Sequence, residues 1–257
     1  MARILVTGAS TGLGLLTARS LVGQGHEVVL HARTAERIEE TSLLGQLVGT
    51  IYGDLADLDA VRRIADEANG LTPLDAVIHN AGVIDGPDLV APYALSALME
   101  RPARAIVLSS SMHRGGSPHH VTDAITGRRE ASYSDTKLWA TALFLGVARR
   151  WPGVLAHAVD PGWVPTRMGG PSASDDLTHG HRTQEWLAVA PEDDIDPQTG
   201  GYWHHYQVRR PHPAALDAPF QDELVAAIEA RTGIALPDRD AGFPADHKHI
   251  TTTRRSP

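Results

Sequence analysis

The sequence lacks cysteine, and it contains neither a long hydrophobic run nor an excess of positive charge. The absence of cysteine from its 257 residues excludes disulfide bonds, thiolate metal ligands and a cysteine nucleophile. The longest apolar run, residues 138–148, has 11 residues, which is too few to cross a membrane. Basic residues number 23 against 31 acidic ones, for a formal net charge of −8. We therefore expect the chain to bind neither a membrane nor nucleic acid.

Hydrophobic residues make up 42% of the sequence, which is enough to build a core. No repeat or clear linker divides the chain, so we expect one domain over residues 1–237. Residues 238–257 are polar and have no periodic pattern, which predicts a C-terminal tail. Strand-like residues begin at position 3 and leave no room for a signal peptide, so we expect a cytoplasmic protein.

Strand-like and helix-like segments alternate along most of the chain. The predicted strands are residues 4–6, 28–30, 50–52, 74–79, 105–108, 154–159 and 201–208. The predicted helices include a segment that follows Gly14 and runs through Leu21, and residues 56–68, 132–150 and 221–232. This alternation predicts an α/β fold, a doubly wound, Rossmann-like parallel sheet flanked by helices. Right-handed crossovers place ligands at the carboxyl ends of the strands. The residues that follow each strand are therefore the candidates for a site.

A glycine-rich turn lies between the first strand and the first helix. Its glycines let the backbone turn sharply and approach a pyrophosphate at the helix N-terminus. The spacing is G-x-x-x-G-x-G, not the G-x-G-x-x-G of typical NAD dehydrogenases, and an ordinary glycine-rich turn is the alternative. We expect this turn to bind a dinucleotide through Gly8, Ser10, Thr11, Gly12, Leu13 and Gly14.

The second strand ends in His31-Ala32-Arg33, where an acid would mark recognition of the ribose 2′-hydroxyl of NAD. Arg33 instead suits a 2′-phosphate, because a guanidinium binds phosphate through two parallel hydrogen bonds. We therefore expect NADP(H) in preference to NAD(H); the alternative is that Arg33 is a solvated loop cation. The next two strands are followed by further candidate cofactor contacts, namely Asp54, Leu55, Asn80, Ala81 and Gly82.

A Tyr-x-x-x-Lys pair opens the predicted helix over residues 132–150. Tyr133 and Lys137 are four residues apart and so share one helix face. Of the 23 basic residues 21 are arginine, leaving two lysines beside five tyrosines, so such a pair is expected only about 0.04 times by chance. Three serines follow the fifth strand, and Pro161–Thr166 follows the sixth, so these segments meet the pair at the same edge of the sheet.

Together these motifs, in this order over residues 3–166, resemble the short-chain dehydrogenase/reductase family and its retinol-dehydrogenase-like branch. The resemblance implies that Tyr133 is the general acid or base. It implies that Lys137 favours the phenolate by its charge and binds the nicotinamide ribose. It also implies that Ser110 donates a hydrogen bond to the substrate oxygen; the run of three serines leaves that register open. The segment after the sixth strand would hold the nicotinamide through Pro161, Gly162, Val164 and Thr166.

The sequence departs from this family in two respects. The family usually carries an asparagine on the helix after the fourth strand, whereas this chain has none beyond Asn80; Asp88 stands near the corresponding position. The segment from Gly82 to Ser109 spans 27 positions, fewer than is usual, so the helix there is expected to be short, over residues 88–99. Because this helix often joins subunits in the family, a homodimer is left open.

Other residues bear on the substrate and on metals. The 14 histidines include no H-E-x-x-H helix, so we expect solvated loop histidines and no metal site. Residues 163–200 are expected to form a substrate loop, in which Trp163, Met168 and Trp186, with Tyr202, either line a pocket or pack in the core.

These residues and the resemblance predict an NADP(H)-dependent oxidoreductase that interconverts a carbonyl and an alcohol on a small hydrophobic substrate. One alternative is a non-catalytic relative that binds the dinucleotide as a sensor or scaffold. The other is a relative that uses the tyrosine and lysine for dehydration or epimerisation.

Overall fold

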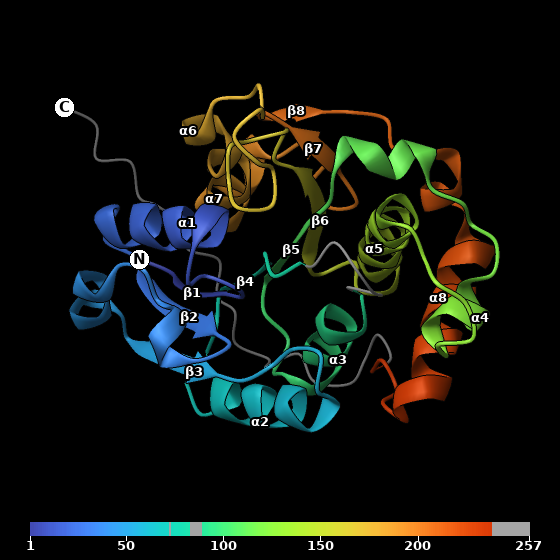
Figure 1. Ribbon diagram of the computed structural model, residues 1–257, viewed down its shortest axis with the longest axis horizontal. Coiled ribbons are helices and arrows are strands. Elements are labelled where there is room, and N and C mark those ends of the chain that lie inside the picture. Colours follow the sequence, from blue (N-terminus) through green and yellow to red (C-terminus); the bar gives the residue numbers. More distant parts are fainter. Residues whose placement is uncertain (72, 83–88, 238–257) are drawn as a thin grey trace.

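The computed structural model describes residues 1–71, 73–82 and 89–237. Within them, eight strands form one sheet in the order β3-β2-β1-β4-β5-β6-β7-β8 (Figure 1). Neighbours from β3 to β7 are parallel, and β8 runs antiparallel to β7. The strands are β1 (Arg3–Val6), β2 (Glu27–Ala32), β3 (Gly49–Tyr52), β4 (Ala76–His79), β5 (Arg104–Leu108), β6 (Leu155–Asp160), β7 (Tyr202–His204) and β8 (Gln207–Val208). The strand order reverses between β1 and β4, and ligands bind at such a reversal in doubly wound sheets.

Helices cover both faces of the sheet (Figure 1). They are α1 (Gly12–Gly23), α2 (Leu58–Asn69), α3 (Val90–Leu98), α4 (Val121–Ile125), α5 (Tyr133–Arg150), α6 (Leu177–Gly180), α7 (Arg182–Val189) and α8 (Ala218–Thr232). One core cluster joins α1 and α7 to the sheet, and the other joins α2, α3 and α5 to the opposite face, with α8 packed against α5. Since alternate strand residues enter the two clusters, the strands are apolar on both faces, as a covered parallel sheet requires.

The helix that carries the tyrosine and lysine is held at its start and along its length. Ser132 and Asp135 form a capping box, in which each side chain accepts a hydrogen bond from the backbone N–H of the other residue. This arrangement satisfies N–H groups that the first turn leaves unpaired. Every residue from Thr136 to Ala148 is buried, so the helix cannot rotate without losing core contacts. The position of Tyr133, at the first residue of α5, follows from this cap.

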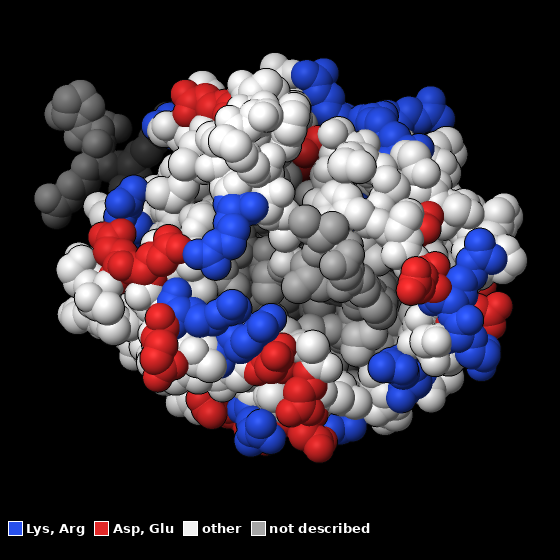
Figure 2. Space-filling view, viewed as in Figure 1, with Lys and Arg blue, Asp and Glu red and all other residues white. Residues whose placement is uncertain are grey.

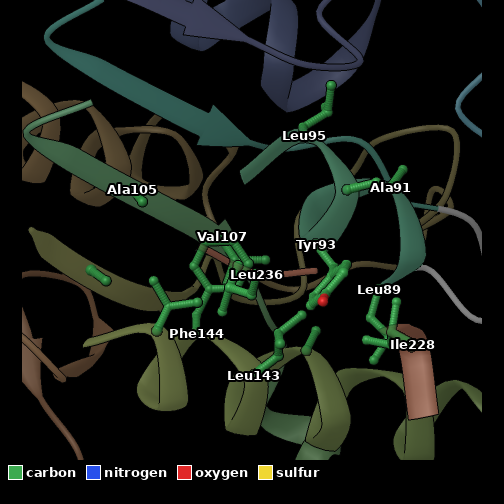
Figure 3. Packing of buried hydrophobic residues seen from close by; sticks show 14 of the residues in the cluster. Leu89, Ala91, Tyr93, Leu95, Ala105, Val107, Leu143, Phe144, Ile228 and Leu236 are labelled. Carbon is green, nitrogen blue, oxygen red and sulfur yellow. The ribbon is translucent and has the colours of Figure 1, made fainter. Parts of the chain in front are cut away.

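The short helix after β4 packs fully into the second cluster. Figure 3 shows Tyr93 of α3 among side chains from β5, α5 and α8. The Tyr93 hydroxyl donates to the backbone oxygen of Ile234, 2.9 Å away, and burial raises the pKa of Tyr93 to about 12. The predicted short helix is therefore present, although Asp88 lies outside the described residues.

The predicted α/β fold is confirmed, and the structure refines three of its elements. The single strand predicted over residues 201–208 is a hairpin, because His205 and Tyr206 both adopt positive φ, 47° and 63°, as a two-residue turn requires. The expected substrate loop over residues 163–200 contains α6 and α7. The last helix begins at Ala218, where Asp217 caps it, and the expected tail over residues 238–257 lies outside the described part. No helix among the described residues is long and apolar enough to span a membrane.

Candidate active site

The glycine loop after β1 leaves the start of α1 open to a ligand. Gly8 has φ +62°, and a Cβ there would lie 2.8 Å from the Cα of Ala81. A Cβ at Gly14 would lie 2.6 Å from the backbone oxygen of Gly8. Among the described residues, the side chain of Thr11, the N-cap, makes no capping hydrogen bond. The glycines are therefore required by close backbone contacts, and the N–H groups of α1 can face an anion.

Two polar side chains, from the strands on either side of β1, hold this loop. The Asn80 amide donates to the backbone oxygens of Thr7 and Gly8, at 2.9 and 3.1 Å. The His31 Nδ1 accepts from the Gly8 N–H at 3.1 Å, while its Nε2 donates to the Gly53 oxygen at 3.0 Å. Burial lowers the pKa of His31, which keeps the ring neutral and its Nδ1 able to accept. Sequence analysis assigned Asn80 to the cofactor and missed His31, whose only signal was a polar residue at the end of a buried strand.

Arg33 and Asp54 stand side by side at the carboxyl ends of β2 and β3. The Arg33 Nε lies 3.4 Å from the Asp54 Oδ2, and the two side chains are 47% and 43% exposed. The Asp54 Oδ1 also accepts from the backbone N–H of Ala56, at 3.0 Å. Figure 2 shows basic and acidic side chains alternating over this region of the molecule. The guanidinium is thus accessible to a phosphate while paired with an acid.

The tyrosine and lysine meet the end of β5. The Lys137 ammonium is 5.4 Å from the centre of the Tyr133 ring. It donates to the backbone oxygen of Leu108 at 3.3 Å. The lysine is buried, with only 6% of its surface exposed. Since Leu108 directly precedes the serine run, the lysine joins the tyrosine to the loop that carries the serines. A cation close to a phenol favours its ionised form.

The three serines occupy different environments. Ser109 is buried, and its hydroxyl lies 2.6 Å from the Thr141 Oγ1, which itself donates to the Lys137 oxygen at 2.7 Å. Ser109 therefore donates to Thr141 and stabilises α5. Ser111 is exposed, whereas Ser110 is half-buried and its Oγ accepts from the Met112 N–H at 3.2 Å. Of the three, Ser110 combines partial burial with a position at the open end of β5.

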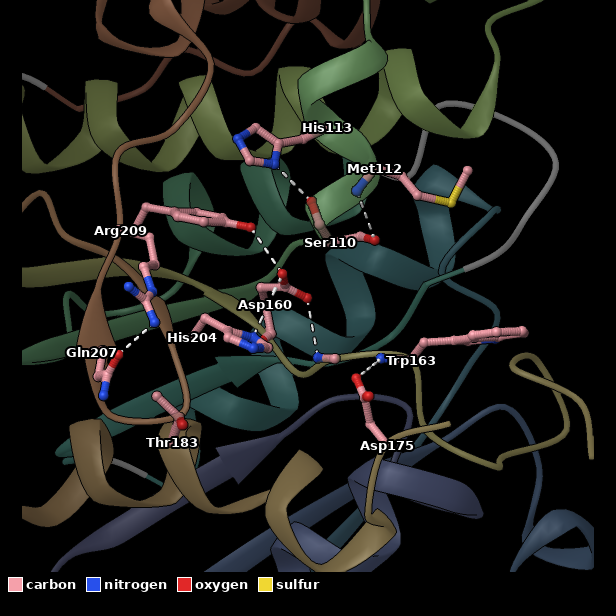
Figure 4. Close-up of polar contacts among 12 residues, drawn as sticks. Ser110, Met112, His113, Asp160, Trp163, Asp175, Thr183, His204, Gln207 and Arg209 are labelled. Carbon is pink, nitrogen blue, oxygen red and sulfur yellow. Dashed lines mark hydrogen bonds and ion pairs between the residues drawn. The ribbon is translucent and has the colours of Figure 1, made fainter. Parts of the chain in front are cut away.

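Asp160 organises the loop after β6, and sequence analysis missed it. Its Oδ1 accepts from the Gly162 N–H at 3.0 Å, and its Oδ2 accepts from the Tyr202 hydroxyl at 3.2 Å (Figure 4). Burial, and then the charge of Asp160, raise the pKa of Tyr202 well above its usual range. Tyr202 is therefore a buried donor to this loop and not part of a pocket wall.

The same loop reaches the glycine turn at one end and solvent at the other. A Cβ on Gly12 would lie 3.7 Å from the Thr166 Cγ2, so Thr166 lies over the start of α1. Asp175 accepts from the Trp163 N–H at 2.7 Å. Trp163 and Met112 are 54% and 55% exposed, and Figure 4 shows them projecting from the loops after β6 and β5. The rim of the site therefore includes two exposed apolar side chains.

The remaining pocket candidates divide between surface and packing. Met168 is exposed, whereas the Trp186 ring packs 5.3 Å from Trp203 and 5.7 Å from Tyr206, centre to centre. Within the described part of the chain, no group of three histidine, aspartate or glutamate side chains is placed to hold a metal ion. The geometry thus combines an open glycine loop, a tyrosine–lysine pair and exposed apolar side chains at one edge of the sheet.

Comparison with known proteins identifies the family. The family model described as short chain dehydrogenase matches residues 2–113. The chain is 36% identical to the short-chain dehydrogenase chyC of Penicillium rubens, over 92% of this chain and 100% of that protein. This chain belongs to the short-chain dehydrogenase family. A human member, dehydrogenase/reductase SDR family member 13, is 30% identical over 92% of this chain and 76% of its own length.

Solved structures agree with this short-chain dehydrogenase fold. An uncharacterized protein from Mycobacterium paratuberculosis has a TM-score of 0.76 and 25% identity, over 92% of this chain and 95% of that one. A blue fluorescent protein from a metagenomic library, solved in complex with NADPH, has a TM-score of 0.63 and 21% identity, over 79% and 95%. The family resemblance and the fold class that the motifs predict are therefore confirmed.

Proposed function

We propose that this short-chain dehydrogenase uses NADP(H) to interconvert a carbonyl and an alcohol on a small hydrophobic substrate. The observation that carries the proposal is the position of Lys137, whose ammonium lies 5.4 Å from the centre of the Tyr133 ring and donates to the end of β5, two residues before Ser110. It gathers a proton donor, a cation and a hydroxyl at the edge of the sheet that also holds the glycine loop. Carbonyl reduction needs a proton at the oxygen as hydride reaches the carbon.

The glycine loop fits a dinucleotide. Side chains at Gly8 or Gly14 would clash with the neighbouring backbone, and the open N-terminus of α1 suits a pyrophosphate. When bound, the dinucleotide supplies or accepts the hydride. Leu13, Ser10 and Thr11 belong to the same loop. Thr166, with Pro161, Gly162 and Val164, would hold the nicotinamide end.

The protein's own groups handle the proton. In reduction, the Tyr133 phenol gives its proton to the substrate oxygen and later regains one from solvent; in oxidation, the phenolate takes the alcohol proton. Lys137 stabilises the phenolate by its positive charge and would bind the nicotinamide ribose. Ser110 donates a hydrogen bond to the substrate oxygen and orients it. The interior position of Ser109 and the exposure of Ser111 support Ser110 in this role.

The preference for NADP(H) rests on Arg33. Its half-exposed guanidinium can bind a 2′-phosphate through two hydrogen bonds. Asp54 and Leu55 would border the adenine, and Asn80, Ala81 and Gly82 would lie against the ribose. A structural neighbour solved with NADPH supports a nicotinamide dinucleotide. The apolar rim of Met112 and Trp163 favours a hydrophobic carbonyl compound.

The direct experiment follows NADPH oxidation against a panel of aldehydes, aromatic ketones and quinones. We expect wild-type turnover with at least one compound and a loss of about 10²-fold or more in Tyr133→Phe, because general acid catalysis contributes about that much. Tyr206→Phe, which removes a phenol from the β7–β8 turn, is the matched control and should retain activity. NADPH binding, followed by fluorescence, should persist in Tyr133→Phe. Binding without turnover on any compound would instead favour a sensor or scaffold.

A further inference from the structure

His113 lies three residues after Ser110 and has no role in the proposed chemistry. It is fully buried, and its Nδ1 lies 2.7 Å from the backbone oxygen of Ser110 (Figure 4). Its Nε2 accepts from the backbone N–H of His212 at 3.0 Å. Because Nε2 accepts, Nδ1 carries the hydrogen and donates to Ser110. Burial lowers the pKa of His113, so the ring stays in this neutral tautomer.

The contacts of His113 reach across 99 positions of the chain, to the segment that follows β8. The ring of Tyr202 lies 4.6 Å from the ring of His113, centre to centre. Through its hydroxyl Tyr202 also holds Asp160, which holds the N–H of Gly162. Strand β7 and the segment after β8 thus support both the serine loop, which is residues 109–111, and the loop after β6.

The backbone of the serine loop is strongly constrained at the carbonyl oxygen of Ser110. The Ser110 oxygen accepts from the His113 N–H at 3.0 Å as well as from its ring. The Ser110 Oγ accepts from the Met112 N–H within the same turn. A rotation of the Ser110 peptide would break these bonds together, so the ring of His113 helps to determine where the serine hydroxyl points.

We propose that His113 is a positioning residue, which orients the Ser110 hydroxyl toward the substrate oxygen by holding the Ser110 carbonyl. This inference rests on the proposed function, in which Ser110 contacts the substrate. His113 itself touches neither substrate nor cofactor. Its removal should therefore change kcat through the serine, since small displacements of a positioning group can cost about 10²-fold in rate.

Two substitutions distinguish the hydrogen bond of Nδ1 from that of Nε2. His113→Asn places an amide nitrogen near the position of Nδ1 and can still donate to Ser110. His113→Gln places an amide oxygen near Nε2 and can still accept from His212, but it loses the bond to Ser110. We expect His113→Asn to keep kcat within about threefold and His113→Gln to lose about tenfold or more. The Kd for NADPH should change in neither variant, and His119→Gln, at an exposed histidine, is the matched control.

A double-mutant cycle with Ser110→Ala decides whether His113 acts through the serine. Turnover is measured with the carbonyl compound that the wild-type enzyme reduces fastest. We expect His113→Gln to lower kcat in the wild-type background and to have little further effect in Ser110→Ala. Equal factors in both backgrounds, or parallel losses in the Asn and Gln variants, would overturn the proposal. If Ser110→Ala leaves kcat unchanged, the role of the serine fails as well; if the wild-type enzyme turns over no compound, the proposed function itself fails.

Discussion

Replacing Arg33 with glutamine tests how the end of β2 distinguishes a phosphorylated from an unphosphorylated dinucleotide. The substitution removes the guanidinium and leaves a shorter, neutral amide. A hydrogen bond to a charged group contributes about 1.5–3 kcal/mol. Arg33 is 47% exposed and is already paired with Asp54, so solvent screening and competition reduce its contribution to about 1–1.4 kcal/mol. We therefore expect the Kd for NADPH to rise about five- to tenfold.

The measurement is a fluorescence titration with NADPH and with NADH at two salt concentrations. NADH affinity should stay within about twofold, because NADH carries no 2′-phosphate. Asp54→Asn should act in the opposite direction and tighten NADPH binding, since it removes the acid that competes for Arg33. Arg231→Gln, in the last turn of α8, changes the net charge equally and serves as control. An equal loss for both cofactors, or no loss for NADPH, would refute the assignment of Arg33.

Three further predictions concern the loop, the pH dependence and the oligomeric state. Gly14→Ala should abolish NADPH binding in the same titration, because its Cβ would lie 2.6 Å from the Gly8 oxygen; binding within threefold of wild type would contradict this. Burial lowers the pKa of His79 to about 3. Below about pH 6.5 the His79 ring therefore binds a proton more readily in the unfolded chain than in the folded one, and the free energy of unfolding should fall as the pH drops from about 6.5 toward 3. Urea titrations should show that the free energy of unfolding falls less steeply with pH in His79→Gln. The same dependence on pH in the variant and the wild type would contradict a contribution from the buried His79. Because residues 136–148 of α5 are already buried within one chain and α8 packs against this helix, we expect a monomer of 27.6 kDa by light scattering; a stable dimer would require a different interface.

Much of the fold could be predicted from the sequence because its signals are local. Each strand is an apolar run followed by turn residues, and each helix has its own period. The glycine turn of Gly8–Gly14 is read from spacing alone, and the cap of α5 lies within four residues. The β7–β8 hairpin could not be predicted in this way, because His205 and Tyr206 are unusual at positive φ. Packing of Tyr206 against Trp186 accompanies this turn in the folded chain.

The site was predictable in its residue types but not in its supporting contacts. The interior position of Ser109 depends on Thr141, which is 32 residues away. The pairing of Tyr202 with Asp160 joins residues 42 positions apart. Nothing in the local pattern links such residues, because the sheet brings them together only after the strands are ordered. The polar residues at strand ends, His31 and Asp160, carried a signal that a search for cofactor motifs overlooks.

Deuterium transfer tests the central claim most directly. The wild-type enzyme and Tyr133→Phe are incubated with NADPH in which both hydrogens of the nicotinamide C4 are replaced by deuterium, together with a carbonyl compound that the wild-type enzyme reduces, and the alcohol is analysed by mass spectrometry. We predict one deuterium on the carbinol carbon with the wild-type enzyme, and loss of product with retained NADPH binding in Tyr133→Phe. Product without deuterium, or undiminished product from Tyr133→Phe, would contradict hydride transfer assisted by this tyrosine.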